Sequence, residues 1–220
     1  MDVPSVGSLS SVGGGKQVEK RTWKEGSPHT YTCNQGSSEL PSWEQRTCLY
    51  THLGKAVLNS RQLRHLELRG IKLTDFSLEP LQILLDSTAT TLNSLDLAAC
   101  GITDSQLQTL LPALSRCSQL VIFSIHGNRL YTSTLSDLLL HTARLSQLSI
   151  ELYPAPLESY DARGTIHPGR CSQLCAELTA IVRDFRQPNF LVFCTVPCRR
   201  CGFKLMYNQG LIHCSCPTAA

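Results

Sequence analysis

Four cysteines near the C-terminal end have the residue type and the spacing of a metal site. Cys198, Cys201, Cys214 and Cys216 follow the pattern C-x2-C-x12-C-x-C. Zinc prefers four thiolates in a tetrahedron, and the first pair, with a glycine after it, is typical of a zinc knuckle. The second pair is unusually close, so a disulfide, free thiols in a loose tail and a redox-active pair stay open as alternatives. A closed four-thiolate zinc site would be structural, because it leaves no open position for chemistry.

The remaining polar residues offer little that could catalyse a reaction. The stretch GGGKQ at residues 13–17 lacks the spacing of a phosphate-binding loop. His126 and Asn128 fall on one predicted turn, where bonding to the backbone is the simpler interpretation. No Ser or Cys is paired with a His in a context that resembles an activated nucleophile. We therefore predict that the protein is not an enzyme and that structural zinc is the one candidate cofactor.

The composition is that of a folded protein with nearly balanced charge. The 220 residues are 42% apolar and 17% charged, with a formal net charge of +3. No segment concentrates positive charge, so a nucleic-acid partner is not predicted. The start lacks a secretory pattern, the longest apolar run is too short to span a membrane, and the eleven cysteines are an odd number. We expect a protein of the cytoplasm, with the nucleus as a further compartment, and no membrane partner.

A repeat of about 28 residues predicts the fold. The pattern L-x-x-L-x-L begins at Leu63, Leu92 and Leu120, and the strand part of a fourth copy begins at Leu145. These starts are 29, 28 and 25 residues apart, which is within the range of leucine-rich repeats. Each copy supplies one short strand whose alternate residues point into a shared core. The predicted core pairs are Leu66 and Leu68, Leu95 and Leu97, Phe123 and Ile125, and Leu148 and Ile150.

Stacking of these copies predicts an α/β leucine-rich-repeat solenoid, which is curved, with a parallel sheet on the concave face, helices outside and a C-terminal cap. Ser77 and Thr134 precede leucine-rich segments and are the predicted N-caps of two helices. In the turns after the strands, Cys100 and Asn128 can bond to the backbone. Ile71 stands at the equivalent place in the first copy and cannot, so that copy is predicted to be less regular.

The chain divides into three predicted parts. Residues 1–46 are of low complexity, show neither helix nor strand periodicity, and are expected to be mostly disordered. Residues 47–150 hold the repeats, after a helix remnant at 47–60. Residues 151–216 hold an insertion, a last helix–strand unit and a cysteine-rich cap.

The insertion, LYPAPLESYDARGTIHPG, follows the last regular strand. A loop of this length in a repeat protein often carries binding function. Its candidate polar contacts are Glu158, Tyr160 and Asp161. The alternative is that the segment is a packed edge of the cap.

Several stretches of the sequence resemble one known family. LSQLSIELYPAPLESYDARG, at residues 145–164, resembles the terminal-repeat signature of the PRAME (preferentially expressed antigen in melanoma) family. Residues 91–120 are similar to the family's penultimate repeats, and the closing RQPNFLVFCTVPCRRCG fits as well. The resemblance covers about residues 61–216, whereas the N-terminal part is unlike the family.

The resemblance implies the substrate-recognition subunit of a cullin-RING ubiquitin ligase, with roles in proteasomal degradation and in regulating proliferation, differentiation and apoptosis. In this family the repeats hold the target, and an N-terminal box recruits elongin and cullin. That recruiting pattern is not found in this chain. The expected partners are therefore protein targets on the concave face or the insertion, and elongin and cullin by resemblance alone.

The alternative function is a transcriptional corepressor that binds nuclear receptors such as the retinoic acid receptor, which the resemblance also implies. The stretches LQILL at 81–85 and LQTLL at 107–111 approximate the L-x-x-L-L receptor box. Both also fit the leucine stripe that a repeat helix needs for its core.

Overall fold

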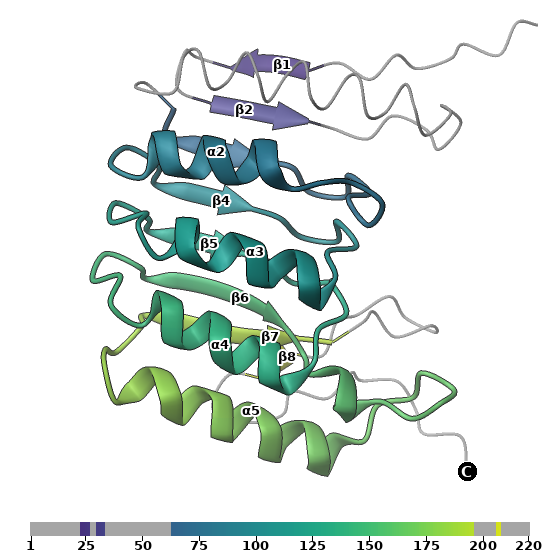
Figure 1. Ribbon diagram of the computed structural model, residues 1–220. Helices are drawn as coiled ribbons and strands as arrows, with labels where there is room; N and C mark the ends of the chain where they lie inside the picture. Colours follow the sequence, from purple (N-terminus) through teal and green to yellow (C-terminus); the bar gives the residue numbers. More distant parts are fainter. Residues whose placement is uncertain (1–22, 27–29, 34–62, 196–205, 208–220) are drawn as a thin grey trace, which may run out of the picture.

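The computed structural model describes residues 23–26, 30–33, 63–195 and 206–207, and their strands form one eight-stranded sheet (Figure 1). The strands cross the sheet in the order of the sequence. Strands β2 to β7 run parallel, and the outermost β1 and β8 each pair antiparallel with their neighbour. The strands are β1 (Trp23–Gly26), β2 (Thr30–Cys33), β3 (His65–Glu67), β4 (Ser94–Asp96), β5 (Ile122–Ser124), β6 (Ile150–Pro154), β7 (Phe190–Cys194) and β8 (Met206–Tyr207).

Four helices of the described chain lie on one face of this sheet, each connecting two parallel strands (Figure 1). Parallel strands need such crossover connections, because a tight turn cannot return the chain to the same end of the sheet. One continuous core lies between the helices and strands β3 to β7. The α/β class with a parallel sheet is therefore confirmed. The helices are α2 (Glu79–Thr88), α3 (Asp104–Leu114), α4 (Thr132–Thr142) and α5 (Pro168–Arg183), with a short 3-10 helix η2 (Leu157–Ser159).

The register of the sheet shows which residues of the first three copies face the helices. Leu66, Leu95 and Phe123 are Cα partners in neighbouring strands, and all three are almost inaccessible to solvent. Side chains alternate along a strand, so the residues two positions further on point to the same side, and they too are buried. The predicted core positions of these three copies are confirmed.

The fourth strand lies three residues later than its predicted position. Phe123 pairs with Glu151, so the fourth copy begins at Leu148 rather than Leu145, and the copies are 29, 28 and 28 residues apart. The prediction that Leu148 and Ile150 form an equivalent core pair is therefore wrong. Leu148 is buried, but Ile150 is half-buried on the other side of the strand. The apolar pattern predicted the wrong start for this copy because the central core position of its strand is occupied by a glutamate, Glu151, in place of an apolar residue.

Glu151 is fully buried because two partners satisfy its carboxylate. Arg186, in the turn between α5 and β7, forms an ion pair with Oε1 and donates from Nη2 to Oε2 at 2.8 Å. The hydroxyl of Tyr153 donates to Oε2 at 2.5 Å. Burial and the neighbouring Glu151 charge raise the pKa of Tyr153 well above its usual value, so this hydroxyl remains a donor. A buried ion pair of this kind ties β6 to the turn before β7.

The turns after β4 and β5 confirm the predicted bonding role. The Asn128 side chain donates to the carbonyls of Leu97 and Ile125, at 2.9 and 2.7 Å, and accepts from the N–H of Ile102 at 2.9 Å. Cys100 makes a corresponding bond from its thiol to the backbone of the preceding unit, at 3.0 Å. These side chains join the turn of one unit to the backbone of the unit before it.

Replacing Asn128 by alanine is expected to lower the free energy of unfolding by about 2 to 3 kcal/mol, because buried backbone groups would lose their partners. Chemical denaturation of the variant and the parent measures the difference. Asn128→Cys is the matched control, since Cys100 serves the preceding turn, and it should recover part of the loss. An unchanged denaturation midpoint in Asn128→Ala would show that the turn is held without this side chain.

The helix starts differ in part from the predicted caps. Helix α2 begins at Glu79, and Ser77 lies two residues earlier, with its Oγ accepting from the Glu79 N–H at 3.3 Å. Ser77 therefore bonds to the helix start without being the N-cap residue. Thr134 lies inside α4 and is buried, so the cap predicted there is wrong. The first N–H of α4 is bonded by a carboxylate 26 residues away, that of Glu158, which no local pattern indicates.

The strands β1 and β2 correct the expectation for the N-terminal part. We found no strand periodicity in residues 1–46 and expected them to be mostly disordered, but residues 23–26 and 30–33 form strands. Strand β2 pairs in parallel with β3, whose backbone groups offer a template for pairing that needs no apolar periodicity. The rest of residues 1–46, and the helix remnant predicted at 47–60, lie outside the described residues. None of the described helices is long and apolar enough to cross a membrane.

Candidate functional site

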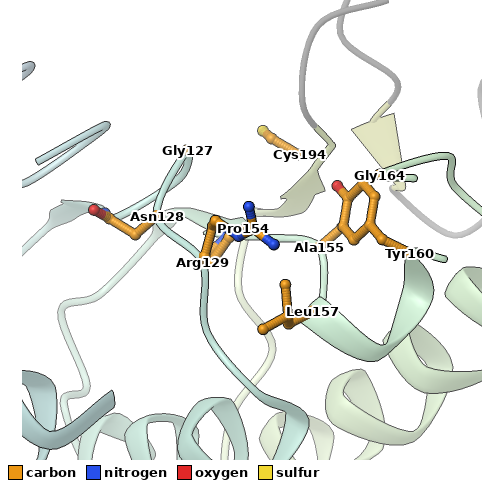
Figure 2. Close-up of a pocket in the computed structure, with 9 residues that line it drawn as sticks. All are labelled: Gly127, Asn128, Arg129, Pro154, Ala155, Leu157, Tyr160, Gly164 and Cys194. Carbon is orange, nitrogen blue, oxygen red and sulfur yellow. The ribbon is translucent and has the colours of Figure 1, made fainter. Parts of the chain in front are cut away.

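A pocket lies at the carboxyl ends of the parallel strands β5, β6 and β7 (Figure 2). Its volume of about 90 Å³ suits one side chain, since pockets for drug-sized ligands are about 300 to 1,000 Å³. The turn after β5, the end of β6, the following loop and the end of β7 contribute to its wall. The lining residues are Gly127, Asn128, Arg129, Pro154, Ala155, Leu157, Tyr160, Gly164 and Cys194.

The turn after β5 depends on a glycine. Gly127 has a φ of +78°, in the left-handed region that side chains disfavour, and a Cβ there would lie 3.3 Å from the Cβ of Ala99. Ala99 holds the equivalent place in the preceding turn, with a φ of 54°. Because these two turns approach so closely, only small residues fit at positions 99 and 127. Arg129 lies two residues after Gly127 and continues this side of the pocket.

The loop after β6 is fastened to the start of α4. Both carboxylate oxygens of Glu158 accept from the backbone N–H of Thr132, each at 3.0 Å. The backbone N–H of Leu157 donates to the carbonyl of Leu130 at 2.8 Å. A carboxylate at a helix N-terminus also interacts favourably with the helix dipole. The pocket wall formed by this loop is therefore held in place by the preceding unit.

Glu158→Ala is expected to lower the free energy of unfolding by about 1 kcal/mol, the usual effect of losing a helix cap. Glu158→Gln is the matched control, because its amide oxygen can still accept from Thr132. Thermal melts of the three proteins, with hydrogen exchange at the first turn of α4, measure both effects. Faster exchange in the alanine variant alone is the expected result, and equal exchange in all three would contradict the capping role.

The other two predicted contact residues of the loop have different places. Tyr160 is half-buried and lines the pocket. Asp161 accepts from the N–H groups of Arg163 and Thr165, at 2.9 and 2.7 Å, and these bonds lower the pKa of its carboxyl. The structure thus brings Tyr160 to the pocket, while Glu158 and Asp161 bond to the chain's own backbone.

Arg129 is a pocket residue that we did not predict. Its side chain is exposed, and it has no hydrogen bond or ion pair with any other described residue. Figure 2 shows it on the β5 side of the pocket, with Tyr160 on the loop side. Lys72 and Gly101 stand at the equivalent turn positions of the earlier units, six residues after the central core residue. Comparing that position among the copies would have shown that this copy alone carries an arginine there.

The second candidate surface is the sheet face opposite the helices, here called the open face because no described helix covers it, although Ser124 and Val192 on it are buried. It is polar on β3 and β4 and mostly apolar on β5 to β7. Ile122 of β5 lies next to its paired residue Ile150 of β6, and Ser124 next to Leu152. Ser124 and His126 bond to each other on it, Oγ to Nδ1, at 3.0 Å. The open face consists of His65, Glu67, Ser94, Asp96, Ile122, Ser124, Ile150, Leu152, Phe190 and Val192, which alternate with the core-facing residues.

The four cysteines predicted to hold zinc, at 198, 201, 214 and 216, lie outside the described residues, so that site stays a prediction. Within residues 63–195 two thiols lie close together in the core. Cys171 and Cys175 are fully buried one turn apart on α5, with 3.9 Å between their sulfur atoms. The hydrogen bond with Cys175 lowers the pKa of Cys171 below that of an ordinary thiol. No group of three His, Cys, Asp or Glu side chains in the described chain could hold a metal ion.

The two stretches that approximate a receptor box are part of the core. The leucines of LQILL lie on α2 and those of LQTLL on α3, and all six are at most 1% exposed. Their exposure to a receptor would require the helices to leave the sheet. The interpretation of these leucines as core residues is therefore confirmed.

Fold and site together define an α/β protein of parallel strands and covering helices, with a small pocket at one edge. The family of the PRAME C-terminal domain matches residues 51–216, and the chain belongs to the PRAME family. It is 58% identical to PRAME family member 12 of Homo sapiens over 154 residues, which are 70% of this chain and 32% of that relative. It is 56% identical to human PRAME family member 8 over 156 residues, which are 71% of this chain and 33% of the relative. The chain thus spans about a third of the length of these relatives.

Proposed function

We propose that this chain is a non-catalytic protein-recognition part of a PRAME-family protein, and that its stacked units form a leucine-rich-repeat solenoid with a C-terminal cap. One observation carries the proposal. The stretch on which the family resemblance rests most strongly, residues 145–164, supplies five of the pocket residues, at positions 154, 155, 157, 160 and 164. A sequence that is specific to the family thus forms a hollow beside the open face.

The chemistry of the pocket supports a protein partner. Its wall is mostly apolar, with the Arg129 guanidinium at one side and the Tyr160 ring at the other. Such a mixture suits one anchoring side chain with a hydrogen-bonding neighbour, as at protein interfaces. Cys194 is the one thiol among the described lining residues, and these include no histidine or carboxylate that could serve as its base. The rest of the contact would be carried by the partly or fully exposed apolar residues of the open face, which are Ile122, Ile150, Leu152 and Phe190.

The family resemblance implies that this recognition role belongs to a cullin-RING ubiquitin ligase, as the subunit that holds the target for proteasomal degradation. We propose the same role here, in the cytoplasm and the nucleus, with effects on proliferation, differentiation and apoptosis. Because the elongin-recruiting pattern is absent from the sequence, recruitment is the part of this proposal that most needs a test.

Affinity purification of the tagged chain, with and without proteasome inhibition, provides that test. Proteins that accumulate on the chain only under inhibition are the expected targets, and elongin and cullin should purify with it. Arg129→Glu should lose the targets and keep elongin and cullin. Arg144→Glu, an exposed arginine in the connection that enters β6, is the matched control and should keep both. Failure of elongin and cullin to purify with the parent would contradict the ligase role.

The same experiment examines the corepressor alternative. Recovery of a nuclear receptor without elongin or cullin would favour it over the ligase role. The leucines of those two stretches are buried in the core on α2 and α3, so a receptor could not contact them in the folded chain. A receptor would then have to contact the pocket or the open face, and Arg129→Glu would release it.

A further inference from the structure

The helices and the strands β3 to β7 are almost free of lysine. Residues 63–195 contain a single lysine, Lys72, and residues 73–203 contain none. The same described residues carry nine arginines, so positive charge is present and only the amine is missing. The arginines are Arg64, Arg69, Arg116, Arg129, Arg144, Arg163, Arg170, Arg183 and Arg186.

The fold does not require arginine at most of these places. Eight of the nine are exposed, and only Arg186 is largely buried, where its planar guanidinium bonds both oxygens of Glu151. The ion pair of Arg116 with Asp86 lies at the surface, where a lysine ammonium would serve a carboxylate about as well. Solubility is no reason either, since both residue types carry the same charge.

What separates the two side chains at an exposed position is chemistry. The lysine amine can lose its proton and act as a nucleophile, whereas the guanidinium stays protonated above pH 12 and does not. In ubiquitin transfer the lysine Nζ attacks the thioester that links ubiquitin's C-terminal carbonyl to a cysteine of the conjugating enzyme. An isopeptide C–N bond forms, the C–S bond breaks, and the amine proton leaves to solvent or to the released thiolate. An arginine surface offers no such acceptor.

We propose that the scarcity of lysine protects the unit formed by strands β3 to β7 and their helices from ubiquitin transfer, and that Lys72 is the one acceptor amine of that unit, since Lys24 lies outside it in β1. The inference rests on the proposed function, because a target-holding subunit of a ligase is itself always close to activated ubiquitin. Accepting ubiquitin on its own recognition surface would send it for degradation with its target. Arginine gives that surface the same positive charge without offering an amine that could accept ubiquitin.

Lys72 stands where such an acceptor would be reached. It is exposed in the turn after β3, six residues beyond the core residue Leu66, the position that Arg129 holds after β5. Both turns lie at the carboxyl edge of the sheet, two strands apart, or about 10 Å by ordinary strand spacing. The one lysine of residues 63–195 is therefore on the edge that carries the candidate pocket.

Gain of acceptors tests the proposal directly. The full chain is expressed in cells with Arg144→Lys, Arg170→Lys and Arg183→Lys together, all at exposed positions. We expect severalfold more ubiquitin conjugation, mapped by mass spectrometry to positions 144, 170 and 183, and a shorter half-life. The matched control carries glutamine at the same three positions and should behave as the parent. Equal thermal melts of the three proteins would exclude misfolding as the cause.

Loss of the acceptor is the complementary test. In a background where Lys16, Lys20, Lys24, Lys55 and Lys204 are changed to arginine, conjugation within residues 63–195 should map to Lys72 alone and disappear in Lys72→Arg. No gain of conjugation in the triple lysine variant would overturn the proposal, whatever its partners are. A gain that persists when cullin neddylation is blocked would sustain the acceptor argument and contradict the ligase role. A gain that disappears under that block would support both.

Discussion

Arg186→Met is expected to lower the free energy of unfolding by about 3 to 5 kcal/mol, the usual effect of removing one partner of a buried ion pair. The substitution leaves the Glu151 carboxylate in the core with only the Tyr153 hydroxyl as a donor. Methionine preserves most of the apolar volume, so the loss reports the uncompensated charge rather than a cavity. Urea denaturation of the variant beside the parent measures the difference.

The control for this prediction removes the charge as well as its partner. A triple variant with Glu151→Leu, Tyr153→Phe and Arg186→Met gives the fourth strand the apolar side chains that Leu95 and Phe123 supply in the earlier strands. Its stability should return to that of the parent or exceed it, since a buried ion pair replaced by apolar residues is often neutral or stabilising. If the triple variant were as unstable as the single one, the loss would stem from packing around Arg186 and not from the buried charge.

Phe123→Asp is expected to unfold the central units, because it places an unpaired charge between β4 and β6 at a cost of several kcal/mol. Phe123 is inaccessible to solvent, and its ring lies edge-on to that of Tyr153, with 6.0 Å between the ring centres. Circular dichroism should show a lost or strongly lowered melting transition. Phe123→Leu, which restores the residue type of Leu66 and Leu95, should melt close to the parent. A parent-like melt for the aspartate variant would contradict the core position of this strand.

The sequence predicted the first three units well because their core positions are apolar and regularly spaced. Leu66, Leu95 and Phe123 lie where the L-x-x-L-x-L pattern requires, and the bonding role of Asn128 follows from its place in the turn. The fourth unit could not be placed in this way. Its central core position is occupied by Glu151, which is acceptable only because Arg186 lies beside it, 35 residues further along the chain.

The candidate site was predicted less well, for a related reason. The insertion was recognised as unusual, and Tyr160 does line the pocket. The pocket itself, however, forms where the ends of three strands meet, and Arg129 and Cys194 come together only through that pairing. Glu158 was expected to contact a partner, but it caps α4, a task that depends on how the loop folds back. A repeat pattern describes the residues of one unit, so it cannot predict which side chains of different units will contact each other.

The strictly sequential order of the strands has a consequence for cooperativity. Paired residues in β3 to β7 are 28 to 40 residues apart, so few contacts join distant parts of the chain, and folding can spread from one unit to the next without closing long loops. In such an arrangement the end units fray before the middle ones open. The bond between Glu151 and Arg186 opposes such fraying. It joins β6 to the turn before β7, so β7 cannot separate from β6 without breaking a buried ion pair. The most polar contact of the core thus joins the last two parallel strands that the structure describes.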